Sequence, residues 1–133
     1  MPIVSLRGPL WPAVLWSIIV VVLLSVPTGT LQSSDYLEWD KVVHFGLFFV
    51  MTWLWLVAAG HRGRGMSLLI LAAAIAFAFA SEWYQHLLPV RSMDVHDAVA
   101  DSAGSVAAWT LWAYLMWRDR NVRHGSPRKK RRR

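Results

Sequence analysis

Residues 68–80, LLILAAAIAFAFA, form a stretch of thirteen residues without one polar side chain. This stretch is the centre of a longer apolar run at residues 66–88. The run is close to the ~20 residues that a helix needs to cross a hydrocarbon core of ~30 Å, at about 1.5 Å per residue. A helix of a water-soluble bundle would need a polar outer face, and this stretch has none. It therefore predicts a membrane-spanning helix.

Three more apolar runs of similar length occupy residues 10–27, 42–59 and 95–117. An apolar fraction of 56% with nine tryptophans is unusual for a soluble protein of 133 residues. The length suits a single domain. We therefore predict an all-α protein, a four-helix transmembrane bundle over residues 1–117, followed by a basic, disordered cytoplasmic tail at residues 118–133.

The first apolar run follows Arg7 and resembles a secretory signal peptide in its layout. The sequence after it, Ser25-Val26-Pro27-Thr28, is a poor cleavage site, and its proline argues further against cleavage. We expect the run to be kept as the first transmembrane helix. The chain has no cysteine, which excludes a disulfide framework and thiol chemistry.

The charged residues are divided between two sets of connections. Seven of the eight acidic residues lie in or beside the connections after the first and third runs, and twelve of the fourteen Lys and Arg lie elsewhere. Those basic residues are Arg7, Arg62, Arg64 and the nine from Arg118 onward. Because cytoplasmic loops carry the excess of Lys and Arg, both termini are predicted to be cytoplasmic, in a protein of the cytoplasmic (inner) membrane.

The connections differ in character. Residues 28–39 are polar and predict a surface loop, and residues 60–65 predict a tight, basic inner loop. Residues 89–93 are a short outer turn, which makes the third and fourth helices an antiparallel hairpin. The basic tail ends in RKKRRR and has no aromatic residue for base stacking, so we expect it to contact anionic lipid and no nucleic acid.

Small residues predict where the helices touch, because close backbone approach supports helix association in lipid. The third helix has alanines at four-residue spacing with two more beside them, and the fourth is rich in Gly, Ala and Ser. The small residues concerned are Ala72, Ala74, Ala76, Ala78 and Ala80 in the third helix and Ser102, Ala103, Gly104, Ser105, Ala107 and Ala108 in the fourth.

Two acidic residues lie inside the predicted hydrocarbon core. Glu82 comes six residues before Leu88, about 9 Å below the outer end of the third helix, and Asp101 comes seven after Asp94, about 10 Å below the same surface. Pairing the hairpin about its turn places Glu82 opposite Asp101. An ionised side chain within the bilayer costs at least ~2.5–3.5 kcal/mol, so these carboxyl groups predict a functional site.

More polar residues reach the same depth from three helices. On the fourth helix Asp94, Asp97 and Asp101 share one face, because their spacing is i, i+3, i+7. The predicted ligand-binding residues are Asp40, Lys41, His44, Glu82, Gln85, Arg91, Asp94, Asp97 and Asp101, and the candidates for catalysis are His44, Glu82, Asp97 and Asp101. Such carboxyl groups must be paired with cations, protonated or bound to a metal, so a divalent cation is one cofactor that the site could hold.

Structural roles compete with these functional ones. Asp94 with Asp97 fits a capping pair at a helix start, and Asp40 with Lys41 fits another. His44 and Gln85 could be interhelical hydrogen-bonding residues. His86 and His96 lie near the water boundary and are expected to be solvated.

Three pieces of sequence resemble the VanZ-like family of small multi-pass membrane proteins. They are DKVVHF at residues 40–45, SEWYQHLLPVRSMDVHD at residues 81–97, and the step from Asp101 to Gly104. These are similar to the family's Asp-Lys-x-x-His-Phe, Glu-x-x-Gln, Pro-x-Arg-x-x-Asp-x-x-Asp and polar-x-x-Gly pieces. The resemblance covers residues 40–108. Asp101 departs from it, since Asn is expected there in many relatives, and adds a charge.

The resemblance implies a role in the cell envelope. The family's namesake is associated with resistance to the glycopeptide teicoplanin, and other members with envelope-active compounds. Tolerance to such antibiotics is therefore one role that the resemblance suggests, but it implies no reaction or ligand.

Four functions are open to this chain. The first is binding or modifying a lipid-linked envelope component, with Lys41 and Arg91 contacting a phosphate. The second is a membrane hydrolase or transferase that uses a divalent metal or acid/base chemistry, although the HEXXH motif is absent. The third is a proton-coupled transporter. The inner halves of the helices argue against it, because they carry no ionisable residue that could continue a proton path. The fourth is a structural scaffold.

Overall fold

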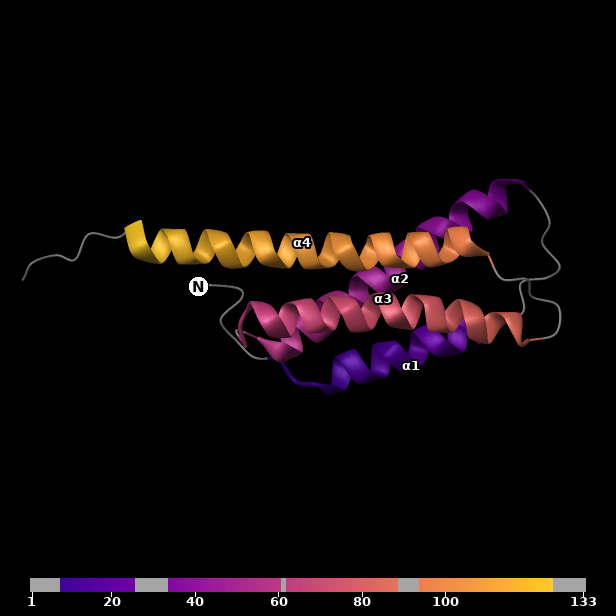
Figure 1. Cartoon of the computed structure of the whole chain (residues 1–133), viewed down its shortest axis with the longest axis horizontal. Coiled ribbons are helices and arrows are strands. Elements are labelled where there is room, and N and C mark those ends of the chain that lie inside the picture. Colours follow the sequence, from indigo (N-terminus) through magenta and orange to yellow (C-terminus); the bar gives the residue numbers. More distant parts are fainter. Residues whose placement is uncertain (1–7, 26–33, 61, 89–93, 126–133) are drawn as a thin grey trace, which may run out of the picture.

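Four α-helices make up the part of the chain that the structure, a computed structural model, describes: residues 8–25, 34–60, 62–88 and 94–125. The helices are α1 (Trp11–Ser25), α2 (Ser34–Ala59), α3 (Arg64–His86) and α4 (Val95–Gly125). They lie side by side along one long axis (Figure 1). Within the described residues there is no strand, and the predicted all-α class is confirmed.

Two helical segments are long and apolar enough to cross a membrane, Trp39–Ala59 in α2 and Arg64–His86 in α3. The helix α1 is apolar but shorter. Only 33% and 22% of the most apolar 18-residue windows of these segments are buried within the bundle, whereas a core helix of a water-soluble domain is mostly buried. Large apolar side chains such as Leu69 and Trp83 face outward, with 62% and 64% of their surface exposed. This exterior fits a membrane protein.

The helices α2 and α4 share the most extensive contact in the bundle. Gly104 allows this contact between α2 and α4, because a Cβ atom at position 104 would overlap the backbone carbonyl oxygen of Phe45. The prediction that a small residue in the fourth helix marks a helix contact is confirmed at this position.

A hydrophobic core joins α1, α2 and α3. It consists of Val20, Leu24, Phe48, Met51, Ala74 and Ala78. Two tryptophans add hydrogen bonds at its edge: Trp16 Nε1 donates to the carbonyl oxygen of Leu47 at 3.1 Å, and Trp55 Nε1 donates to Ser17 Oγ at 3.1 Å. These bonds tie α1 to α2.

The buried face of α3 differs from the predicted alanine stripe. Ala74 and Ala78 are buried, whereas Ala72, Ala76 and Ala80 are exposed. The buried face continues through Ser81, Glu82 and Gln85 at helical spacing. The polar residues near the end of α3 therefore determine which side of the helix faces the bundle. They must be buried against the other helices, and the alanines on the same side of α3 are buried with them.

Two helix ends differ from the predicted connections. The helix α2 begins at Ser34, inside the predicted surface loop at residues 28–39, and α4 continues to Gly125, into the tail expected to be disordered. Neither residues 34–40 nor residues 118–124 contain Gly or Pro, so nothing in them breaks a helix. The rest of the predicted tail, residues 126–133, lies outside the described residues.

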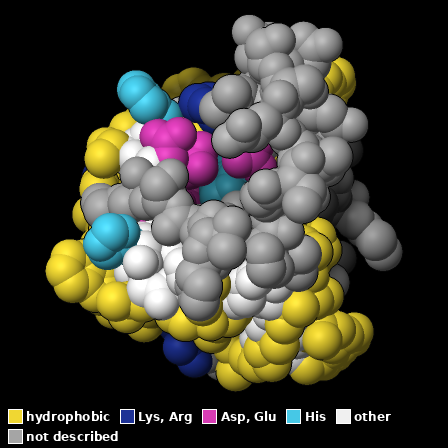
Figure 2. All heavy atoms as spheres, turned by 90° about the vertical axis from the view of Figure 1, so that its right-hand side faces the viewer, with side chains coloured by type: hydrophobic (Ala, Val, Ile, Leu, Met, Phe, Trp, Pro, Cys, Tyr) yellow, Lys and Arg dark blue, Asp and Glu magenta, His cyan; other side chains and the backbone are white. Residues whose placement is uncertain are grey.

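Seen end-on, the bundle has acidic side chains toward its middle and hydrophobic side chains along much of its described edge (Figure 2). Figure 2 shows Asp, Glu and His side chains gathered where α2 and α4 begin and α3 ends, with hydrophobic side chains around them. The cluster thus lies at one end of the helices and not midway along them.

Candidate functional site

A buried histidine and a buried aspartate form the centre of this cluster. The Nδ1 atom of His44, on α2, lies 3.0 Å from Oδ1 of Asp101, on α4. The exposed fractions of the two residues are 2% and 0%. Ser105, one turn further along α4, donates its hydroxyl hydrogen to the Asp101 carbonyl oxygen at 3.1 Å.

The helix α3 adds Glu82, which is fully buried. Its Oε2 atom accepts a hydrogen bond from the backbone N–H of Asp94 at 3.3 Å, across the connection between α3 and α4. His44, Glu82 and Asp101 each offer one possible metal-ligand atom, and these atoms all lie within 4.8 Å of one another. The structure thus brings together the two deep carboxyl groups that the hairpin pairing placed opposite each other.

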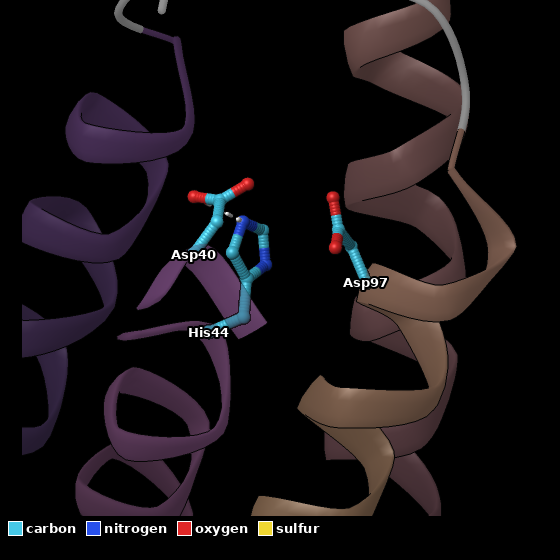
Figure 3. A group of neighbouring side chains, drawn as sticks. All are labelled: Asp40, His44 and Asp97. Atoms are coloured by element: carbon cyan, nitrogen blue, oxygen red, sulfur yellow. Dashed lines mark ion pairs between the residues drawn. The ribbon is translucent and has the colours of Figure 1, made fainter. Parts of the chain in front are cut away.

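The same histidine also belongs to a second trio. Asp40 Oδ1 lies 3.9 Å from His44 Nε2, and possible ligand atoms of Asp40, His44 and Asp97 all lie within 4.8 Å of one another. Figure 3 shows the imidazole ring between Asp40, from its own helix, and the carboxyl group of Asp97, from α4. The Asp40 side chain is 41% exposed, whereas Asp97 is 8% exposed.

Several polar atoms of the cluster are buried and have no hydrogen-bond partner among the described residues. They are Glu82 Oε1, Gln85 Nε2, Asp97 Oδ1 and Asp101 Oδ2. Leaving one such group unpaired costs ~1–3 kcal/mol, and more when it is charged. Four of them at one end of a small bundle are a cost to folding, which a bound ligand would offset.

The cluster is also unbalanced in charge. Its described members include four carboxyl groups, Asp40, Glu82, Asp97 and Asp101, together with His44 and Lys41. Lys41 is half-buried and acts electrostatically on Asp97. All buried ionisable residues of the described chain belong to this cluster, and the remainder of the described interior holds only uncharged polar groups such as Thr52. A proton path along the bundle has no further ionisable group to use there.

Each of the remaining predicted site residues has either a structural role in the fold or a role that stays a prediction. Asp94 precedes α4, and its Oδ1 accepts a hydrogen bond from the N–H of His96 at 2.8 Å, which confirms the capping role predicted for Asp94. His86 and His96 are exposed, as expected, and belong to neither trio. Arg91, predicted to contact a ligand, lies outside the described residues. The binding and catalytic roles of the cluster stay predictions.

The sequence predicted Ser105 at a helix contact but not as part of the polar interior, and it did not single out Thr52, although both are fully buried. Ser105 follows Asp101 by four residues. At that spacing in a helix, a serine hydroxyl group can donate a hydrogen bond to the carbonyl oxygen of the earlier residue, as it does here. Thr52 has no such signal, because it lies alone among apolar residues of α2.

Comparison with known proteins places the chain in a family. A search of curated proteins and a search of solved structures each found no match. One family model, described as VanZ/LLP1, matches residues 10–117, a range that includes most of the chain and every described residue of the cluster. The match confirms the resemblance seen in the sequence pieces around Asp40, Glu82 and Asp97. By this match the chain belongs to the VanZ/LLP1 family.

Proposed function

We propose that this protein crosses the cytoplasmic membrane four times and that its charged cluster, facing outward, binds the phosphate-bearing headgroup of a lipid-linked cell-envelope component. Both termini are cytoplasmic in this proposal. It follows from the family, from the apolar exterior and from the position of the cluster at one end of the helices.

The distribution of charge supports the orientation. The cluster end of the bundle carries Asp40, Glu82, Asp97 and Asp101, whereas the opposite end carries Arg62, Arg64 and the basic C-terminal segment. Lys and Arg are retained on the cytoplasmic side. The acidic cluster is then outside, and the basic tail would contact the anionic lipids of the inner leaflet.

Two of the four proposed membrane spans, α1 and α4, are less typical of membrane-spanning helices in length or composition. Both differences are consistent with the proposal. The helix α1 has 15 residues, and the chain before it at Leu10 is also apolar. The helix α4 carries Asp97 and Asp101 within its first turns, which lowers its apolar character at the cluster. A helix that lines a polar site inside a membrane needs such residues on its inner face.

The observation that carries the proposal is the burial of three charged or ionisable side chains, His44, Glu82 and Asp101, which come from three different helices. A scaffold could join its helices with uncharged hydrogen bonds at far lower cost. Polar groups converging near the headgroup level of a membrane are suited to a headgroup ligand. Lys41 and Arg91 would supply positive charge to its phosphate.

Mass spectrometry of co-purifying lipids tests the proposal. The full-length protein is extracted in mild detergent, and bound lipids are compared between the native chain and the Lys41→Gln, Arg91→Gln double variant. We expect the double variant to lose a specific phosphate-bearing lipid. Arg64→Gln is the matched control, because Arg64 is exposed at the other end of α3, about 27 Å from Glu82 along the helix. Equal lipid retention in all three proteins would refute the proposal.

A further inference from the structure

We infer that Asp40, His44 and Asp97 form a binding site for a divalent transition-metal cation of the zinc type, and that Asp101 is the positioning residue that orients the histidine. The site needs no lipid, so it goes beyond the proposed headgroup binding.

The hydrogen bond to Asp101 determines which nitrogen of His44 is available. A carboxylate oxygen 3.0 Å from Nδ1 accepts a hydrogen bond, so the proton of a neutral imidazole is on Nδ1. The lone pair is then on Nε2, the atom that lies nearest Asp40. Metal-binding histidines commonly donate their other N–H to a carboxylate in this way, which holds the ring in place and raises its basicity.

Three atoms therefore face one another that can each donate an electron pair to a metal ion, and none of the three carries a hydrogen atom. They are a nitrogen of His44, a carboxylate oxygen of Asp40 and one of Asp97, which all lie within 4.8 Å of one another, and Nε2 is the His44 nitrogen that lies nearest Asp40. Two ligands of one zinc ion can be at most about 4.4 Å apart, twice the longest Zn–O bond of ~2.2 Å. The 3.9 Å between Asp40 Oδ1 and His44 Nε2 is below this limit. A small side-chain rotation would bring the third ligand into range.

Asp97 supplies a separate indication that a ligand belongs here. It is more than nine-tenths buried, its carboxyl group faces the imidazole ring in Figure 3, and its Oδ1 atom has no hydrogen-bond partner among the described residues. A protonated His44 could pair with Asp101 and Asp40 but would leave this oxygen unpaired. A cation between Nε2 and the two carboxylates would satisfy all three.

The other trio, His44, Glu82 and Asp101, is less suited to hold the ion. Its histidine nitrogen nearest Asp101 is already occupied by the hydrogen bond, and all three residues are fully buried. In the Asp40 trio the partly exposed Asp40 side chain leaves a route from solvent. A bound ion needs such a route as well as ligands.

Three protein ligands would leave one coordination position of a tetrahedral zinc open, as in catalytic zinc sites. A water molecule or a phosphate oxygen could take that position. In the second case the cation would join an anionic headgroup to a cluster of carboxylates that would otherwise repel it. This bridging role rests on the proposed function, whereas the metal site itself does not.

Titration of the purified protein with zinc chloride tests the site. The full-length chain is prepared without a polyhistidine tag, stripped with a chelator and titrated by calorimetry, and bound zinc is counted by elemental mass spectrometry. We expect one zinc ion per chain. His44→Gln and Asp97→Asn should abolish binding, and Asp101→Asn should weaken it by about 10–100-fold while leaving the stoichiometry unchanged at saturation.

Three further variants make the outcome decisive. His96→Gln removes an exposed histidine next to Asp97 and should bind zinc like the native chain. Asp40→Asn changes a partly exposed ligand, so it should fold even if the buried variants do not, and should bind at least tenfold more weakly. Glu82→Gln should retain zinc. No saturable zinc in the native chain, native affinity in Asp40→Asn and Asp97→Asn, or loss confined to Glu82→Gln would each overturn the assignment.

Lipids are measured in the same preparations. Zinc binding without a specific lipid would uphold the metal site and count against the proposed function. A specific lipid retained without zinc binding would support the proposed function and count against the metal site.

Discussion

His44 Nδ1 and Asp101 Oδ1 lie 3.0 Å apart, although the two residues are separated by 57 positions in the chain. Their contact joins α2 to α4, the pair of helices with the most extensive contact, and both side chains are buried. Because a buried polar pair is costly when one member is missing, this contact has consequences for stability that can be measured.

Asp101→Ala should destabilise the protein strongly. Removing one partner of a buried charged pair costs ~3–5 kcal/mol, since it leaves the other partner unsatisfied. Unfolding in detergent, followed by circular dichroism, measures the loss. The His44→Ala, Asp101→Ala double variant should be less destabilised than the sum of the two single variants, because it leaves no orphaned partner. Additive effects would contradict a direct interaction.

Gly104→Ala should also destabilise, by about 1–3 kcal/mol, because the new methyl group would overlap the backbone of α2 at Phe45. Gly46→Ala is the matched control in the facing helix. An added Cβ at Gly46 meets nothing within 4 Å, so this change should be neutral or stabilise by up to about 1 kcal/mol through helix propensity. Thermal unfolding of both variants distinguishes them, and equal effects would argue against the close approach.

Gln85→Met should stabilise the purified protein and weaken its lipid retention. The Nε2 atom of Gln85 is buried without a partner among the described residues, so removing the amide should recover ~1–3 kcal/mol. Thr52→Val is the control: Thr52 Oγ1 is also buried and unpartnered, but it lies eight residues from His44, about 12 Å along α2. Both variants should unfold at higher temperature, and only Gln85→Met should lose lipid. If both variants retain lipid equally, Gln85 is not part of the binding site.

Cysteine labelling of intact cells should place the acidic connections outside. The native chain has no cysteine, so single cysteines can be introduced at Ser92, in the outer turn predicted from the sequence, and at Arg62, in the connection before α3. A membrane-impermeant thiol reagent should label Ser92→Cys in intact cells and Arg62→Cys only after the membrane is opened. The reverse pattern would invert the proposed topology.

The local features of this protein were accessible from its sequence. Runs of apolar residues near 20 in length predict helices, and the described part of the chain folds as four helices. The spacing of Asp94, Asp97 and Asp101, together with the short turn before them, predicts that Glu82 and Asp101 converge, because a hairpin pairs positions that are equally distant from its turn. These predictions need only the helical repeat and the order of elements along the chain.

The rotation of α3 and the ends of α2 and α4 were not accessible in the same way. Alanine covers most sides of α3, so side-chain size alone cannot tell Ala74 and Ala78 from Ala72 and Ala76. Polar composition likewise does not distinguish a surface loop from a helical extension at residues 34–39.

Composition and order along the chain thus determined an apolar helical protein with charged groups near one end. Only tertiary packing decided that α2 lies against α4 closely enough for His44 to meet Asp101 through Nδ1 and to turn Nε2 toward Asp40. The physical reason is that no short connection joins α2 to α4. Their register depends on the close approach of Gly104 to Phe45, a contact between distant segments that no local pattern encodes.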